Sequence, residues 1–188
     1  MSIKYSSRTR DQTGLRVYSD ADYAGDPNGR HSTTGILILW NGQPVHWKSS
    51  KQSCVAQSTT EAEYIAASTA YKEVLWLRQL LAQVLDPQEG FDLPSTPLHI
   101  DNQSALQLAS TIAINQRSKH IDVRYHAIRE GVAHKTIALI DTDTQDQLAD
   151  LFTKPLALPM FRYMLDAITR NSYAPKSRIN DQERTAKE

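Results

Sequence analysis

The chain has 188 residues, of which 40% are hydrophobic and 22% are charged, proportions typical of one globular domain with its own core. Its 21 lysines and arginines balance its 21 aspartates and glutamates, which argues against a polyanion binder that depends on overall charge. The single cysteine, Cys54, excludes an internal disulfide.

The two ends of the chain differ in composition from the middle. Residues 1–13 are predicted to form a flexible segment, and residues 171–188, which are polar and charged, a disordered tail. The folded domain is therefore expected over 14–170. The start carries no apolar signal sequence, and no apolar run reaches the roughly 20 residues of a membrane span, so we expect an intracellular protein without a membrane partner.

The first half is predicted to be an antiparallel meander of three strands. Leu15–Asp20 is short, rich in strand-forming residues and ends in an acid, and Thr33–Trp40 is apolar and β-branched. Asn41-Gly42 is a strong hairpin signal, after which Pro44–Lys51 returns as the third strand.

A long amphipathic helix is predicted next, over Thr60–Leu85, because the period of the apolar residues changes from two to three and four. The apolar positions that carry this period are Ala66, Ala70, Val74, Leu77, Leu81 and Val84. Leu98–Asp101 is then expected as another short strand that ends in an acid.

The remaining elements alternate between helices and one strand. Helices are predicted over Gln103–Leu108, Ile121–Ala133, Gln145–Phe152 and Met160–Ile168, with a strand over Thr136–Ile140. Three antiparallel strands followed by strands that alternate with helices indicate an α/β fold with a mixed sheet covered by helices.

Four acids occupy special places in these elements. Asp20 and Asp101 end strands, Glu61 lies in the first turn of the long helix, and Asp150 lies in a helix after the last strand. Ligand sites of open α/β sheets lie at the carboxyl ends of strands, and Mg²⁺ prefers oxygen ligands. Together the four acids predict a divalent metal site.

Each acid also has a purely structural interpretation. Asp20 and Asp101 could be turn residues, and Asp150 alone could be a surface acid of a helix. The segment Ser58–Glu61 has the pattern of a capping box, in which Glu61 is structural. The same box one step along has Thr60 as cap and Glu63 in the third helical position, which leaves Glu61 free to bind metal.

Five segments closely resemble, in family order over roughly 15–165, the RNase H domain of copia-type LTR retrotransposon Pol polyproteins. They are Tyr18–Gly25 (YSDADYAG), Ser58–Tyr64 (STTEAEY), Leu98–Ala105 (LHIDNQSA), Ser118–His126 (SKHIDVRYH) and Gln147–Pro155 (QLADLFTKP).

The resemblance implies an RNase H-like fold: a five-stranded mixed sheet, three antiparallel strands then parallel strands, with helices on both faces. It also implies four catalytic and metal-binding carboxylates, with Asp22 and Glu63 as the nearest alternatives; mapped by motif, the four are Asp20, Glu61, Asp101 and Asp150. They would hold two Mg²⁺ ions, for which Mn²⁺ can substitute. The implied reaction is hydrolysis of the RNA strand of RNA–DNA hybrids during reverse transcription, leaving 5′-phosphate and 3′-hydroxyl ends.

Residues that flank the acids are candidates for contact with the hybrid. Small polar side chains suit the 2′-hydroxyls of RNA, and cationic side chains suit phosphates. The polar candidates are Gln57, Asn102, Gln103 and Ser104; the cationic ones are Lys48, Lys51, Arg117 and Lys119; His120 is expected to face the substrate. Any two of the cations could equally be solvated surface charges, and His120 could be structural.

The expected partner besides the hybrid is the reverse transcriptase polymerase domain of the same polyprotein, in a cytoplasmic virus-like particle or in the nucleus. One alternative is a weakly active or inactive RNase H-like module that binds or tethers nucleic acid, and another is a domesticated relic of an element. An integrase-like strand transferase is disfavoured because its glutamate would follow two aspartates, whereas Glu61 precedes Asp101.

Overall fold

The structure is a computed structural model that describes residues 3, 5, 14–85, 93–110 and 127–169. These residues contain a five-stranded sheet in the order β3-β2-β1-β4-β5. The predicted flexible segment 1–13 lies outside the described residues except for Ile3 and Tyr5, and the predicted tail 171–188 lies outside them entirely. Those two expectations stay predictions.

The first three strands form the predicted meander. β1 (Leu15–Asp22) pairs antiparallel with β2 (Thr33–Trp40), and β2 pairs antiparallel with β3 (Gln43–Lys51). Asn41 and Gly42 both have positive φ, 49° and 78°, which is the conformation of a type I′ hairpin turn.

The other two strands are parallel to β1. β4 (Thr96–Ile100) pairs with β1, and β5 (Ile137–Asp141) pairs with β4. Tyr18 of β1 is paired with His99 of β4, so the residues that follow β4 lie beside the last residues of β1. This end of the two strands carries the candidate site.

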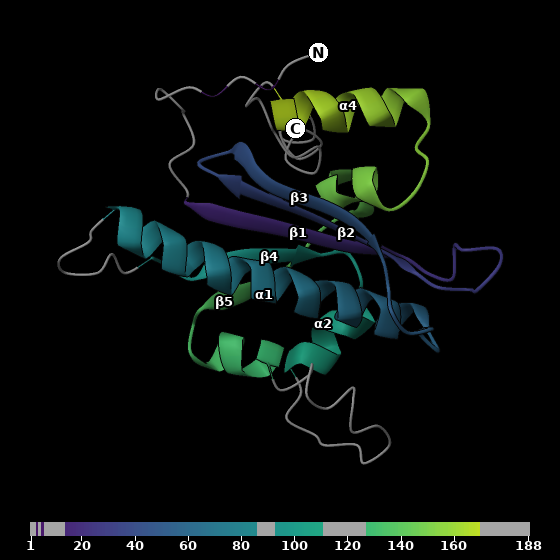
Figure 1. Cartoon of the computed structure of the whole chain (residues 1–188), viewed down its shortest axis with the longest axis horizontal. Helices are drawn as coiled ribbons and strands as arrows, with labels where there is room; N and C mark the ends of the chain where they lie inside the picture. Colours follow the sequence, from purple (N-terminus) through teal and green to yellow (C-terminus); the bar gives the residue numbers. More distant parts are fainter. Residues whose placement is uncertain (1–2, 4, 6–13, 86–92, 111–126, 170–188) are drawn as a thin grey trace, which may run out of the picture.

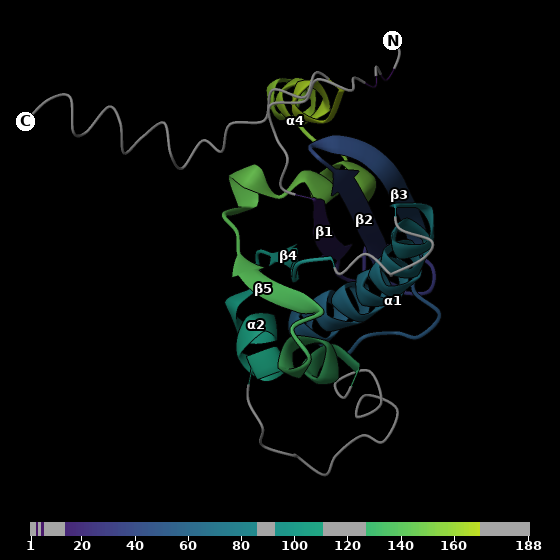
Figure 2. The same cartoon turned by 90° about the vertical axis from the view of Figure 1, so that its left-hand side faces the viewer.

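Helices cover both faces of the sheet (Figures 1 and 2). On one face α1 (Thr59–Leu85), α2 (Gln103–Ser110) and the helical residues 127–133 bury one cluster of apolar side chains, which includes Val17, Ile38 and Leu98. On the other face α4 (Leu158–Thr169) and the 3₁₀ turn η2 (Leu148–Phe152) pack on a second cluster. The apolar stripe predicted for α1 is buried through Leu77, whereas Val84 is exposed.

The segment predicted as one helix over Gln145–Phe152 is instead two 3₁₀ turns, η1 (Thr144–Asp146) and η2. Gln147 separates them in an extended conformation, with φ −78° and ψ 90°. Its side chain is fully buried, and its amide donates a hydrogen bond to the Ser19 carbonyl, 3.1 Å away, while its oxygen accepts one from the Ala149 N–H. The tertiary hydrogen bond to Ser19 and the local one from Ala149 outweigh the helical preference of the segment.

The helix predicted over Ile121–Ala133 is described only from residue 127, and residues 127–133 are helical. Among the described residues, no helix has the length and apolar character needed to cross a membrane.

Candidate active site

The pairing of β1 with β4 brings two acids to one level of the sheet. Tyr18 is paired with His99, so Asp20 and Asp101, each two residues further along, lie next to each other. Asp20 is buried, with 2% of its surface exposed, and Asp101 is half-buried just beyond the end of β4. Thr144 of η1 donates a hydrogen bond of 3.1 Å to Asp101 Oδ2.

The start of α1 adds a third acid, Glu63. Ala62 and Ala66, whose small side chains let the helix lie close to the strand, pack against Ala21 of β1. Gln52, at the end of β3, ties this part of α1 to the sheet, since its amide donates to the Ala62 carbonyl and to Thr34 Oγ1. Glu63 is therefore buried, and its Oε1 accepts a hydrogen bond of 3.3 Å from the Ala21 N–H.

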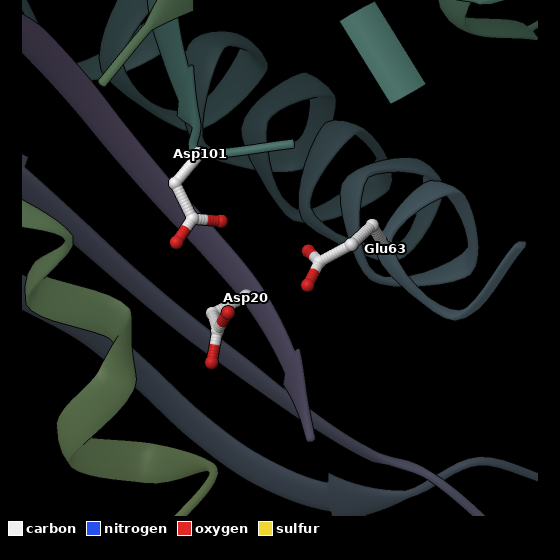
Figure 3. A group of neighbouring side chains, drawn as sticks. All are labelled: Asp20, Glu63 and Asp101. Carbon is white, nitrogen blue, oxygen red and sulfur yellow. The ribbon is translucent and has the colours of Figure 1, made fainter. Parts of the chain in front are cut away.

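Asp20, Glu63 and Asp101 form what we call the carboxylate triad. One carboxylate oxygen of each lies within 4.8 Å of the others. Figure 3 shows the three side chains pointing toward one another from β1, α1 and the end of β4. Three carboxylates this close repel one another unless protons or cations reduce their charge.

The structure places the Glu61 carboxylate at the start of α1, outside the triad. The residue before α1 is Ser58, and its Oγ accepts a hydrogen bond from the Glu61 N–H. The Glu61 carboxylate folds back and accepts a hydrogen bond of 2.7 Å from the Gln57 N–H. Glu61 thus caps the helix, and Glu63, the alternative, faces the other acids.

A fourth acid, Asp150, approaches Asp20 from η2. The 3₁₀ turn lies close against β2 at Gly35, where an added Cβ would lie 2.7 Å from the Ala149 carbonyl oxygen. Thr153, at the end of η2, donates a hydrogen bond to Asp20 Oδ2. Asp150 lies beside Asp20, since one ammonium group, that of Lys154, is within 3.8 Å of a carboxylate oxygen of each, and we call these two residues the Asp20–Asp150 pair.

A lysine accompanies the acids. Lys154 Nζ lies 2.9 Å from Asp150 Oδ2 and 3.8 Å from Asp20 Oδ2. Burial lowers the pKa of Lys154, but its hydrogen bond to Asp150 and the nearby carboxylates raise it by more, so that the pKa is raised overall. Lys154 is therefore charged at neutral pH.

Burial and mutual repulsion raise the pKa values of the acids. Burial, followed by the charges of Asp20 and Asp101, raises the pKa of Glu63 to about 9. Burial and then the charge of Asp20 raise the pKa of Asp150 to about 7, and the same two causes raise that of Asp101. Glu63 therefore holds a proton at neutral pH in the metal-free protein, and a divalent cation bound there would compete with that proton.

The donor set suits a hard divalent cation such as Mg²⁺, because it consists of carboxylate oxygens. Glu63 Oε2 and Asp150 Oδ1 are buried and have no hydrogen-bond partner among the described residues. Buried carboxylate oxygens are costly without a partner, and cations bound by these carboxylates would supply partners. Asp20, Glu63, Asp101 and Asp150 therefore fit the metal site that the motifs imply.

The polar candidates for contact with nucleic acid differ in their exposure to solvent. Gln57, Gln103 and Ser104 have exposed side chains beside the acids in sequence. Asn102 is half-buried, and its Oδ1 accepts a hydrogen bond from the Ala105 N–H at the start of α2.

The cationic candidates have acidic partners or are not described. Lys48 pairs with Glu73 at 3.1 Å, and Lys51 pairs with Asp26. Both pairs include a well-exposed lysine, so each is weak and leaves the lysine able to exchange partners. Arg117, Lys119 and His120 lie outside the described residues.

The helical spacing of α1 in the sequence already indicates that Glu63 lies on the buried face. The apolar stripe of α1 includes Ala66 and Ala70, and Glu63 precedes them by three and seven residues, which is the spacing of one helical face. Glu61 falls off that face. No comparable signal identifies Gln52, Gln147, Thr144 or Thr153, because their contacts join segments far apart in the chain.

Comparisons with known proteins agree with this architecture. No protein-family model matches the chain. It is 39% identical over 158 residues to the retrovirus-related Pol polyprotein from transposon TNT 1-94 of Nicotiana tabacum, a match that covers 84% of this chain and 12% of the polyprotein. It is 37% identical over 149 residues to the Pol polyprotein from transposon RE1 of Arabidopsis thaliana, covering 79% and 10%. The chain thus spans about a tenth of the length of these relatives.

Solved structures show the fold. The crystal structure of LC11-RNase H1 in complex with an RNA/DNA hybrid superposes with a TM-score of 0.52 at 12% identity, covering 74% of this chain and 93% of that one. An N-terminal RNase H domain from Mycobacterium tuberculosis gives a TM-score of 0.51 at 9% identity, covering 82% and 97%. The predicted RNase H-like fold is confirmed.

Proposed function

Because the chain is a homologue of a segment of the retrovirus-related Pol polyproteins of plant transposons and has the RNase H fold, we propose that it is a ribonuclease H that cuts the RNA strand of RNA–DNA hybrids. The observation that carries the proposal is the convergence of the carboxylate triad, of which one oxygen each lies within 4.8 Å of the others, with Asp150 beside Asp20. We assign the metal-binding role to Asp20, Glu63, Asp101 and Asp150, so that Glu63 replaces Glu61.

In this proposal the carboxylates bind the cations, and neighbouring hydroxyl groups orient the carboxylates. Asp20 belongs to both the triad and the Asp20–Asp150 pair, and the hydroxyls of Thr144 and Thr153 hold Asp101 and Asp20 in place. Two divalent cations bound at these carboxylates would supply the acidity that turns water into a nucleophile and offset the charge on the leaving 3′ oxygen. The expected ends are a 5′-phosphate and a 3′-hydroxyl. Mg²⁺ is the proposed ion, and Mn²⁺ a substitute.

The substrate is inferred from chemistry at the rim of the site. RNA differs from DNA by its 2′-hydroxyls, which the exposed Gln57, Gln103 and Ser104 can contact. Since the whole chain is neutral and the cations Lys48 and Lys51 already have acidic partners, hybrid binding should be weak and strongly salt-dependent. A polymerase domain from the same polyprotein would be the natural partner that holds the hybrid.

The test is cleavage of a labelled RNA–DNA hybrid at low salt with Mg²⁺ or Mn²⁺. We expect cutting of the RNA strand alone, no cutting of a DNA duplex of the same sequence, and loss of activity with EDTA or in Asp101→Asn. Persistent cleavage in Asp101→Asn would exclude the carboxylate mechanism. A folded protein that binds Mn²⁺ yet cuts no hybrid, even at low salt, would favour a module that only binds or tethers nucleic acid.

A further inference from the structure

The ammonium group of Lys154 contacts two of the four acids of the site, Asp20 and Asp150. Lys154 Nζ contacts the Oδ2 atoms of Asp150 and Asp20, at 2.9 Å and 3.8 Å. Asp20 also belongs to the carboxylate triad, in which Glu63 Oε2 has no hydrogen-bond partner among the described residues. A positive charge thus already sits at the Asp20–Asp150 pair, whereas none is bonded to Glu63.

Lys154 is held at this place by the local backbone. Its N–H donates to the Asp150 carbonyl at 3.4 Å, so the two side chains lie four residues apart on one side of the turn. The lysine side chain is 35% exposed, while the side chains of Asp20 and Asp150 are 3% and 4% exposed. The ammonium therefore closes the solvent side of a buried pair of acids, and it can swing out to water without unfolding the turn.

A divalent cation at the Asp20–Asp150 pair would need the oxygens that Lys154 now contacts. Both positive charges cannot occupy that place, since like charges a few ångströms apart in a partly buried site repel strongly. In the triad, Lys154 contacts only Asp20, at 3.8 Å, and among the described residues no ion pair joins a cation to Glu63 or Asp101.

We propose that Lys154 is a built-in counter-ion that a divalent cation must displace from the Asp20–Asp150 pair, whereas the carboxylate triad accepts a cation with Lys154 in place. This inference rests on the proposed metal-dependent function. It implies that two cations bind in sequence: the first at the triad, and the second, more weakly, at the pair that Lys154 neutralises.

The test is a Mn²⁺ titration of the full chain at pH 8, followed by calorimetry and by electron paramagnetic resonance of the free ion. Lys154→Met keeps the length of the side chain and removes its charge. In Lys154→Met we expect the Kd for Mn²⁺ at the weaker site to fall about tenfold, because a charged hydrogen bond no longer has to be broken. The Kd at the tighter site should change by less than about threefold. Lys154→Arg keeps the charge and should keep two unequal sites.

A matched control is Lys72→Met, on an exposed position of α1 about 13 Å along the helix from Glu63. It should leave both affinities unchanged. Thermal unfolding gives a second readout that needs no activity. Lys154→Met should lower the Tm of the metal-free protein, because two buried acids lose their counter-ion, and saturating Mn²⁺ should restore it.

The outcomes separate this inference from the proposed function. Two Mn²⁺ sites in the wild type with an unchanged or weakened second site in Lys154→Met would overturn the role of Lys154 and leave the metal site intact. A wild-type chain that binds no Mn²⁺ would overturn both. Equal tightening of both sites in Lys154→Met would mean a general effect of charge, and it too would refute displacement.

Discussion

Replacing Glu63 with Gln tests whether Glu63, which is buried among the acids, or Glu61, which caps α1, is the metal ligand. The pKa of Glu63 is about 9 against an ordinary value of 4.5, so the folded protein keeps this proton long after the unfolded chain has lost it. Between those two values the folded state binds more protons, and its stability therefore falls as pH rises. Glu63→Gln is neutral in both states and removes this contribution.

The size of the effect follows from the same values. At pH 8, at ~1.4 kcal/mol per pH unit above 4.5, Glu63 costs the metal-free protein at most about 5 kcal/mol. Because buried charges relax toward water and counter-ions, we expect a gain of about 2 kcal/mol in Glu63→Gln. For a domain of this size that corresponds to a Tm higher by about 4–8 °C at pH 8, and the gain should shrink to near zero at pH 4.5.

Glu61→Gln is the matched control, two residues away on the same helix. It keeps an acceptor for the Gln57 N–H but removes a negative charge from the helix N-terminus, which costs about 0.3–1 kcal/mol. Its Tm should fall slightly, whereas that of Glu63→Gln should rise. Melting of both variants in EDTA, with Mn²⁺ binding and hybrid cleavage as further readouts, should show that only Glu63→Gln loses metal and activity. The opposite pattern, with metal binding lost in Glu61→Gln alone, would refute the assignment of Glu63.

Three more outcomes are expected. Gly35→Ala should lower stability by about 1–3 kcal/mol and reduce cleavage, because the new methyl group would meet the Ala149 carbonyl and push η2, with Asp150, away from β2; wild-type melting and cleavage would contradict this. Gln147→Leu should cost about 1–3 kcal/mol in urea unfolding, since the buried Ser19 carbonyl loses its donor, and a cost below about 0.5 kcal/mol would mean that water or another donor replaces it. Saturation with Mg²⁺ at about 100 times its Kd should stabilise the protein by about 2.7 kcal/mol, reversibly with EDTA and not in Asp101→Asn; an equal gain in Asp101→Asn would place the ion elsewhere.

Local sequence signals were sufficient wherever one element decides its own structure. The limits of β2, the turn at Asn41 and Gly42, and the long helix α1 follow from β-branched runs, turn chemistry and apolar period, all of which act within a few residues. The position of Asp101 directly after β4 follows in the same way, whereas β1 continues two residues past its predicted end at Asp20, because Ala21 and Asp22 still pair with β2. The motifs then identified the fold, which the solved RNase H structures confirm.

Local signals failed where a distant contact overrode them. Gln145–Phe152 has helical character, yet the buried side chain of Gln147 bonds to a carbonyl of β1 and divides the segment into two 3₁₀ turns. Glu61 and Glu63 fit two overlapping capping boxes, and a motif alone does not choose between them.

The sequence by itself therefore determined the order of the elements and the presence of acids near the ends of strands, because these depend on local period and composition, and its motifs identified the fold through their resemblance to a known family. Only the tertiary structure decided which acids converge. The packing of α1 on β1 places Glu63 against Ala21 and leaves Glu61 at the helix cap. The close contact of η2 with Gly35 places Asp150 and Lys154 beside Asp20. These are packing relations between segments up to 133 residues apart, as in the hydrogen bond from Thr153 to Asp20, and no local pattern encodes them.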